Sequence, residues 1–391
     1  MSDENKAQQK LSTDPYKGVR DFYPEDMAIQ NYIFSVWKKV AEKYGYQEYS
    51  ASILEPAELY RAKSGEEIIN EQTYTFTDRG DREVTIRPEM TPTVARMVAA
   101  KKRELPYPLR WFSIPNLFRY EKPQRGRLRE HWQLNVDMFG VESTQSEVEV
   151  ISLAADILHE FGMKNNDFEI VINDRQLMKD IPHKLSKLID KKDKMSKEDF
   201  VKAAKEITDI DVLEMLADIK PSDKVSAVLD GLDKLGVTNV RFDSSLMRGF
   251  DYYTGIVFEV FDRHPENRRS LFGGGRYDEL LSLFGNEKVA AFGFGMGDVT
   301  MRDTLETYDL LPKKPHGADI YIAVLEEKAF GYAQDIAQKL REDGKKVSLD
   351  YSLKKVGDQI KTALKLKIPK LIVIGETEMN KGSYEIRDIH A

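Results

Sequence analysis

Residues 118–133 read FRYEKPQRGRLREHWQ, and this stretch, called here the arginine hairpin, decides the fold of the chain. Apolar residues stand on both sides of a charged turn, a pattern that predicts a hairpin with two half-buried strands. Its cations are Arg119, Lys122, Arg125, Arg127 and Arg129, against the acids Glu121 and Glu130. Arg119 ends an apolar strand and is expected to point into a cleft, where a guanidinium binds phosphate oxygens well. A solvated, charged hairpin tip is the alternative interpretation.

The segments around this hairpin alternate between helix and strand patterns. Helices are predicted at 27–44, 91–101 and 145–161, and strands at 46–54, 73–76, 83–86, 109–120, 132–139, 240–242 and 255–261. Antiparallel strands joined by short, charged loops are the simplest interpretation. We therefore predict an α+β domain with an antiparallel sheet flanked by helices.

Two further regions depart from this pattern. Residues 176–236 are dense in lysine and aspartate and contain amphipathic stretches such as DVLEMLADI, which predict a helical insertion. Beyond LLPKKPHG, whose prolines and lysines mark a linker, strands and helices alternate, which predicts a small α/β domain with a largely parallel sheet. The expected boundaries are a disordered tail at 1–14, the α+β domain at 15–175 and 237–304, the insertion at 176–236, the linker at 305–317 and the α/β domain at 318–391.

The strands and helices expected in the α/β domain end in an edge strand at 383–388, followed by DIHA. No closing helix is predicted after that strand. We therefore expect this domain to be C-terminally truncated.

The composition limits the class of protein. With 41% hydrophobic and 32% charged residues the chain is globular, and its 391 residues are too many for one ordinary core. No run of eighteen apolar residues or secretory signal is apparent, so we expect no membrane segment and a cytoplasmic location. The absence of cysteine excludes disulfides and thiolate metal sites. A net charge of −7 still allows local basic patches to hold a polyanion.

The arginine hairpin resembles motif 2 of the class II aminoacyl-tRNA synthetases, through FRYEKPQ followed by GRLREHWQ. The resemblance implies that Arg119 holds the α-phosphate of ATP, that Glu121 lies near the adenine and that Arg127 lies near the γ-phosphate. It also implies that Lys122 and Gln124 face the terminal base pair of the tRNA.

Residues 246–259, LMRGFDYYTGIVFE, carry the most specific motif. Adjacent tyrosines on a strand point to opposite faces, so an ordinary aromatic strand end would offer only one of them to a pocket. However, RGFDYYTG resembles a signature of the histidyl-tRNA synthetase family. That resemblance implies that Arg248 contacts the α-phosphate, where other class II enzymes use magnesium, and that Tyr252 and Tyr253 bind histidine.

The segment TIRPEMTPTVARM, residues 85–97, ends a strand before a helix, with Thr91 a plausible N-cap. A plain capping segment is the alternative. The resemblance implies that Glu89 and Thr91 lie beside the α-ammonium of histidine, and that Gln133 and Asp137 complete the pocket. Paired polar contacts to the imidazole would penalise other amino acids.

Two further segments follow the family pattern. The glycine-rich turn SLFGGGRYDEL, residues 270–280, is weak support for a phosphate or substrate site by itself. By resemblance, Gly274, Arg276 and Tyr277 of this turn belong to the histidine site. ILEPAEL, residues 53–59, is similar to motif 1, which implies that Pro56 lies at the interface of a homodimer.

One segment departs from the family. AFGFGMGDVTM, residues 291–301, has the glycines of motif 3, but Thr300 stands where an ATP-binding arginine is expected. Arg302 lies two residues further along a predicted helix and so faces another direction. Either Arg302 or an arginine elsewhere substitutes, or ATP binding is weakened.

The C-terminal domain resembles the α/β anticodon-binding domain of this group. Residues 351–370 carry six lysines against the single acid Asp358. Such a face, including Lys354 and Lys355, would contact tRNA phosphates, although a solvated helix face is an equally simple interpretation.

The resemblance implies an ATP-dependent histidine–tRNA ligase. It would use ATP with Mg²⁺ and no metal ligand from protein side chains, and its partners would be L-histidine, ATP, the histidine tRNA and a second copy of the chain. A regulatory subunit that senses histidine without catalysis is the alternative, and Thr300 favours it. Against it, motif 2 and RGFDYYTG are intact. A synthetase for another amino acid would not explain RGFDYYTG together with RPEMT.

Overall fold

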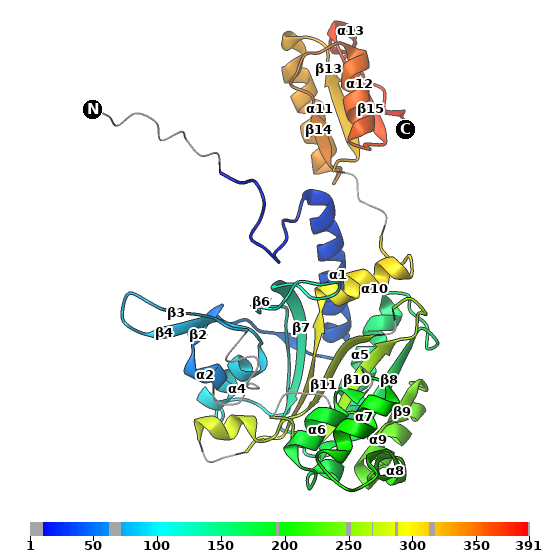
Figure 1. Ribbon diagram of the computed structural model, residues 1–391. Coiled ribbons are helices and arrows are strands. Elements are labelled where there is room, and N and C mark those ends of the chain that lie inside the picture. Colours follow the sequence, from blue (N-terminus) through cyan, green and yellow to red (C-terminus); the bar gives the residue numbers. More distant parts are fainter. Residues whose placement is uncertain are drawn as a thin grey trace, which may run out of the picture. The chain divides into compact units, whose positions relative to one another are not determined.

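The computed structural model describes residues 11–61, 72–192, 195–247, 252–267, 269–285, 288–312 and 317–389. The chain divides into two compact units, Met1–Leu311 and Pro312–Ala391 (Figure 1). Within these described ranges, no helix combines the length and apolar character needed to cross a membrane.

The first unit is mixed α and β. Its strands are β1 (Gln47–Glu48), β2 (Leu54–Pro56), β3 (Tyr74–Thr77), β4 (Glu83–Ile86), β5 (Leu109–Ser113), β6 (Asn116–Phe118), β7 (Glu130–Phe139), β8 (Phe168–Asp174), β9 (Val240–Phe242), β10 (Ile256–Asp262), β11 (Ser270–Arg276) and β12 (Ala291–Gly297). Its α-helices are α1 (Pro24–Lys43), α2 (Glu58–Arg61), α4 (Thr91–Ala100), α5 (Gln145–Glu160), α6 (His183–Ile189), α7 (Lys197–Lys205), α8 (Val212–Asp218), α9 (Asp223–Lys234) and α10 (Asp298–Thr307).

A large sheet organises this unit. Among the described residues it has nine strands, in the order β1-β5-β7-β12-β11-β10-β8-β9 with β6 paired to β7. The neighbours from β5 to β8 are all antiparallel, and only the outer pairs β1–β5 and β8–β9 are parallel. The predicted α+β class, an antiparallel sheet flanked by helices, is therefore confirmed.

The strand predicted at 46–54 is wrong as a single element. The chain there forms two short strands in two different sheets, because β1 pairs with β5 of the large sheet and β2 pairs with β4 of a separate three-stranded sheet. Arg87, on the segment after β4, donates hydrogen bonds to the carbonyls of Ala51 and Ser52 and so holds the crossing between the sheets.

The two faces of the large sheet have different side chains. On β12, Phe292, Phe294 and Met296 enter the main core, which they share with α1, α5, α9 and α10. The alternating positions Gly293 and Gly295 face the other side, because successive residues of a strand point to opposite faces. One face is thus filled with apolar side chains, and the other carries almost none along β12.

A buried carboxylate ties the beginning of the unit to its last strand. Asp298 is fully buried and accepts hydrogen bonds from Arg20 at 2.7 Å, from the side chain of Gln30 at 2.9 Å and from the backbone N–H of Trp132 at 2.9 Å. The segment before α1, helix α1 itself and strand β7 therefore meet at the start of α10.

The helices between β8 and β9 belong to two cores. Helices α6, α7 and α8 share a small core that includes Leu185, Phe200 and Leu216. Helix α9 instead packs Val225 and Leu232 into the main core. These residues lie on one face of α9 at helical spacing, which explains why the helix docks on α5 rather than on its sequence neighbours.

The second unit is an α/β domain with a sheet in the order β14-β13-β15-β16, as predicted in class. Its elements are β13 (Ile320–Val324), α11 (Phe330–Glu342), β14 (Val347–Leu349), α12 (Val356–Lys365), β15 (Lys370–Ile374), α13 (Glu376–Lys381) and β16 (Arg387–Asp388). The first three strands in this sheet order are parallel and β16 is antiparallel. The edge strand predicted at 383–388 is shorter than expected, because only residues 387–388 pair with β15. The segment before it, residues 376–381, forms α13, which ends at Gly382 in the left-handed conformation.

Gln359 of α12 closes the end of β13. Its fully buried amide donates to the carbonyl of Val324 at 2.8 Å and accepts from the N–H of the same residue at 3.0 Å. It also donates to the carbonyl of Lys354 at 2.7 Å. One side chain thus satisfies three backbone groups that have little access to water.

We expect Gln359→Leu to destabilise the second unit by about 2–4 kcal/mol, because the buried N–H and C=O of Val324 would lose their partner. Faster hydrogen exchange over residues 320–324 is the measurement, with Gln338→Leu as the control because Gln338 is exposed and donates to Glu342 on α11. Unchanged protection of residues 320–324 in the Gln359 variant would contradict this role.

Candidate active site

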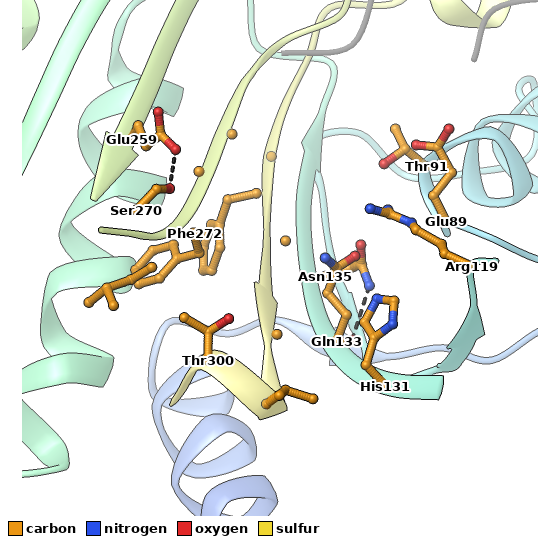
Figure 2. A pocket seen from close by; sticks show the side chains of 18 of the residues that line it. Glu89, Thr91, Arg119, His131, Gln133, Asn135, Glu259, Ser270, Phe272 and Thr300 are labelled. Carbon is orange, nitrogen blue, oxygen red and sulfur yellow. Dashed lines mark hydrogen bonds between the residues drawn. The ribbon is translucent and has the colours of Figure 1, made fainter. Parts of the chain in front are cut away.

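A cavity of about 450 Å³ lies on the glycine face of the large sheet. Figure 2 shows it between β7, β11 and β12, with the segment before α4 on one side. It gathers most of the predicted site residues, from separate parts of the sequence: Glu89, Thr91, Arg119, Glu121, Arg127, Gln133, Asp137, Tyr252, Tyr253, Gly274 and Tyr277.

The floor of the cavity depends on glycine. A Cβ atom at Gly293 would overlap the carboxylate of Asp137, and one at Gly295 would lie within 3 Å of the side chain of Gln133. These glycines therefore let the polar side chains of β7 lie flat across the neighbouring strand β12. Gly274 has the same property on β11, because a Cβ there would overlap the backbone of β12.

One end of the cavity is built from buried acids and tyrosines. The hydroxyl of Tyr252 donates to Glu89 at 3.1 Å, and the hydroxyl of Tyr277 donates to Asp137. Glu89 is only 2% exposed, and burial raises the pKa of Tyr252 and of Tyr277 well above the ordinary tyrosine value. The hydroxyls therefore remain protonated donors, and this end of the cavity attracts a cation.

Asp137 is the most perturbed acid of this group. Burial raises its pKa to about 7, although the hydrogen bond from Tyr277 opposes that shift. Its second oxygen, Oδ2, accepts no hydrogen bond from the described residues. A buried carboxylate oxygen without a partner, lining a cavity, is a binding position for a donor group of a ligand.

Both tyrosines of the YY pair line the cavity. The alternative of an ordinary strand end, which would offer only one of them, does not apply, because Tyr252 and Tyr253 precede β10, which begins at Ile256, and so do not follow the alternation of a strand. Their rings meet edge to face with centroids 5.1 Å apart. Arg248, of the same motif, lies outside the described residues.

The cationic side chains of the cavity, called here its cationic end, begin directly beside the acidic ones, since Arg119 lies next to Glu89 in Figure 2. The Nε of Arg119 donates to the carbonyl of Pro88 at 2.8 Å, which fixes the guanidinium at the cavity wall. Glu121 lies between two arginines, 4.0 Å from Arg119 and 3.9 Å from Arg127. An anionic ligand entering here would meet both guanidinium groups.

His131 also lines this end and was not predicted from the sequence. Burial, together with the positive charges of Arg119 and Arg20, lowers its pKa to about 3. The imidazole is therefore neutral at physiological pH and offers a flat face without charge. Along β7 the residues 131, 133, 135 and 137 all line the cavity. Because every second residue of a strand faces the same side, a step of two residues either way from Gln133 would have predicted His131 and Asn135.

Other lining residues were also missed. Figure 2 shows Glu259, Ser270 and Phe272 on the wall opposite β7, with a hydrogen bond from Ser270 to Glu259. Their place follows from the pairing of β10 with β11, which brings residues from both strands to one wall. No local motif marks them.

Arg276 does not reach the cavity. Its buried guanidinium binds Glu147 through two nitrogens, at 2.7 and 2.6 Å, and Ser146 at 2.8 Å, both at the start of α5. The implied contact of Arg276 with histidine is therefore not what the geometry supports, because Glu147 and Ser146 hold the guanidinium away from the cavity. Arg276 instead anchors the end of β11 to α5.

The remaining predicted residues lie away from the cavity lining. Lys122 and Gln124 are on the turn of the arginine hairpin, and Pro56 is exposed on β2. Lys354 and Lys355 are exposed before α12 in the second unit.

Thr91 is the first residue of α4 and makes no capping hydrogen bond, since the cap position is Met90, so the N-cap prediction is wrong.

Thr300 lines the cavity, and Arg302 does not. The hydroxyl of Thr300 donates to the carbonyl of Gly126 at 3.4 Å, whereas Arg302 binds Asp26 of α1 at 2.7 Å. Arg302 therefore does not replace the missing arginine, because its ion pair with Asp26 of α1 holds it away from the cavity.

The pKa of Asp137 predicts a pH-dependent stability. Because the carboxyl is still protonated in the native chain up to about pH 7, but ionises near pH 3.9 when unfolded, the native state holds an extra proton in this window. The free energy of unfolding should therefore fall as pH rises from about 4 to 7, with a contribution of about 1.4 kcal/mol per pH unit. Asp137→Asn should remove this contribution.

Urea denaturation of the full chain between pH 5 and 6.5, followed by tryptophan fluorescence, measures this slope, because Trp37, Trp111 and Trp132 all lie in the first unit. Asp218→Asn, an exposed substitution on α8, is the control and should follow the wild-type slope. If the free energy of unfolding changed with pH by the same amount in wild type and in Asp137→Asn, the buried carboxyl of Asp137 would not hold an extra proton in the native state.

Comparisons with known proteins agree with this geometry. The family described as "Histidyl-tRNA synthetase" matches residues 18–298, and the family "Anticodon binding domain" matches residues 319–391. A histidine–tRNA ligase of Leptospira biflexa is 45% identical over 414 residues, covering 98% of this chain and 94% of that protein, and one of Thermoplasma volcanium is 36% identical over 95% of this chain and 93% of that protein. The crystal structure of apo histidyl-tRNA synthetase from S. aureus superposes with a TM-score of 0.74 at 26% identity, covering 97% of both chains.

Proposed function

Because the chain belongs to the histidyl-tRNA synthetase family and is a histidine–tRNA ligase, we propose that its cavity holds histidine at the acidic end and ATP at the cationic end. The observation that carries this proposal is the convergence of Glu89, Arg119 and Asp137, from three separate segments, on one cavity. An amino acid with a cationic and a basic group fits the first end, and a triphosphate fits the second.

At the acidic end, Glu89 is proposed to receive the α-ammonium of histidine, beside Thr91. Asp137 and the tyrosines Tyr252, Tyr253 and Tyr277 would receive the imidazole. The unpartnered Oδ2 of Asp137 supports this assignment, because an imidazole N–H supplies the donor that this oxygen needs. A ligand without that donor would leave the oxygen buried and unpaired, which is how the site would reject other amino acids.

At the cationic end, Arg119 is proposed to bind the α-phosphate and Arg127 the γ-phosphate, with Glu121 near the adenine. The neutral imidazole of His131 lies at the same end and adds an uncharged flat surface on which a purine ring can stack. Arg248, outside the described residues, keeps its predicted place on the α-phosphate. Gly274 and Gln133 would shape the floor between the two ligands.

The chemistry is an in-line displacement at the α-phosphorus. A carboxylate oxygen of histidine forms a bond to this phosphorus, the bond to the β-phosphate oxygen breaks, and pyrophosphate leaves as histidyl-adenylate forms. No protein base is needed, because the attacking carboxylate is already ionised at neutral pH. The contribution of the chain is position and charge, since Arg119 would neutralise the negative charge that develops on the phosphoryl oxygens.

The partners follow from the family. We propose that the histidine tRNA receives the histidyl group at its 3′ end, that Lys122 and Gln124 lie near its acceptor stem, and that Lys354 and Lys355 contact its phosphates from the second unit. ATP would enter as its Mg²⁺ complex. Pro56, exposed on β2, would lie at a homodimer interface, and the cytoplasm is the proposed compartment.

Histidine-dependent exchange of labelled pyrophosphate into ATP tests adenylation. We expect exchange with histidine alone among the twenty amino acids, and a loss of at least about 100-fold in Arg119→Gln and in Arg248→Ala, because each removes a charge aimed at the transition state. Histidine binding by calorimetry without any exchange would support the sensor that Thr300 suggested, and would overturn the proposed reaction.

Glu89→Gln and Asp137→Asn test the two halves of the histidine site. Each should raise the KM for histidine by about 10-fold or more and leave the KM for ATP nearly unchanged, because each removes one charge-assisted contact to the amino acid only. Lys288→Gln, on the exposed surface beside Glu279, is a control that should change neither constant. If these variants raised the KM for ATP instead, the assignment of histidine to the acidic end and of ATP to the cationic end would be wrong.

A further inference from the structure

One carboxylate holds two arginines beside the turn of the arginine hairpin. Asp303, on α10, accepts a hydrogen bond from Nε of Arg125 at 2.9 Å through one oxygen, and pairs with the guanidinium of Arg269 through the other. Arg269 also donates to the carbonyl of Arg125 at 3.3 Å. Helix α10, the start of β11 and the hairpin turn are therefore joined at a single anion.

The same turn meets α10 a second time, through the hydrogen bond from Thr300 to the carbonyl of Gly126. Gly126 has a φ of +78°, and a Cβ atom at this position would overlap the guanidinium of Arg269. Backbone hydrogen bonds of 3.0 and 2.9 Å between Gln124 and Arg127 close the turn. The turn is therefore tight, and its glycine is packed directly on Arg269.

The position of this turn determines the position of the guanidinium of Arg127 at the cationic end of the cavity. Gly126 and Arg127 both line the cavity, so a shift of the turn away from α10 would carry Arg127 with it. Among the described residues of α10, the one arginine, Arg302, is paired with Asp26. Thr300, where the family pattern has an arginine, carries no charge and uses its hydroxyl on the turn.

We propose that Asp303 and Arg269 form a clamp that seats the hairpin turn over the nucleotide end of the cavity, in place of a direct contact between α10 and ATP. Both are positioning residues that act through Arg127. The side chains of Asp303 and Arg269 are only 19% and 25% exposed, so their pairing is screened less by water than that of an ordinary surface pair. The inference rests on the proposed binding of ATP at this end, and it makes ATP affinity, but not histidine affinity, depend on the clamp.

Histidine-dependent pyrophosphate exchange, with ATP and histidine varied separately, tests the clamp. We expect Asp303→Asn and Arg269→Gln to raise the KM for ATP about tenfold, with the KM for histidine unchanged within about twofold. Arg125→Gln should have a smaller effect, because the side chain of Arg125 is 64% exposed. Arg263→Gln is the matched control: Arg263 lies in the same connection between β10 and β11 and is 45% exposed, but pairs with Glu169.

Two further variants separate a clamp from general damage. Asp303→Glu keeps the charge and should restore most of the ATP affinity lost in Asp303→Asn. The double variant Asp303→Asn with Arg269→Gln should bind ATP no more weakly than Asp303→Asn alone, because the carboxylate that both arginines need is already gone. An equal rise in the KM for ATP and for histidine would indicate a merely structural role and overturn the clamp.

A measurement independent of turnover keeps the clamp and the proposed function distinguishable. Calorimetric titration with ATP alone gives the Kd of each variant, so absence of exchange in the wild-type chain would overturn the proposed function without deciding the clamp. Trypsin cleavage after Arg125 or Arg127 should be faster in Asp303→Asn than in wild type, since the turn would be released. An unchanged Kd for ATP together with unchanged cleavage would overturn the clamp.

Discussion

The close packing of β12 against the polar residues of β7 is the constraint on which the site depends. Gly293 and Gly295 leave room for the side chains of Asp137 and Gln133 to lie across the strand, and any larger residue would push them out of the cavity floor. The opposite face of the same strand is filled by Phe292 and Met296, which hold β12 in the main core. One strand therefore supplies both the rigidity of the core and the empty space of the site, because its residues alternate between the two.

The cavity brings acidic and cationic side chains close together. Glu89 and Asp137 accept hydrogen bonds from tyrosine hydroxyls, Arg119 lies beside Glu89 in Figure 2, and Glu121 lies between the guanidinium groups of Arg119 and Arg127. This proximity keeps buried charges near groups of opposite sign or near a donor, which limits the desolvation cost of holding so many ionisable groups in one cavity.

The period of the strands and the family motifs were enough to predict the fold class and most of the polar cavity lining. The same period, followed along β7, would have added His131 and Asn135 to Gln133. What the sequence could not reveal were contacts between remote segments. Arg269 and Asp303 are 34 residues apart and Arg125 and Asp303 are 178 apart, and no local pattern relates them. The helix α13 was missed because a six-residue helix has too little periodicity to detect.

The place of β12 in the sheet also has a consequence for synthesis on the ribosome. β12 joins β7 to β11, so the two halves of the sheet, made from residues before 140 and after 167, have no common strand until residues 291–297 have left the exit tunnel. Asp298, the next residue, then gathers Arg20 and Gln30, which were made 278 and 268 residues earlier. The nascent chain must therefore carry an unpaired edge of β7 while residues 140–290 are made, which exposes it to aggregation and to chaperones until one late segment closes the sheet.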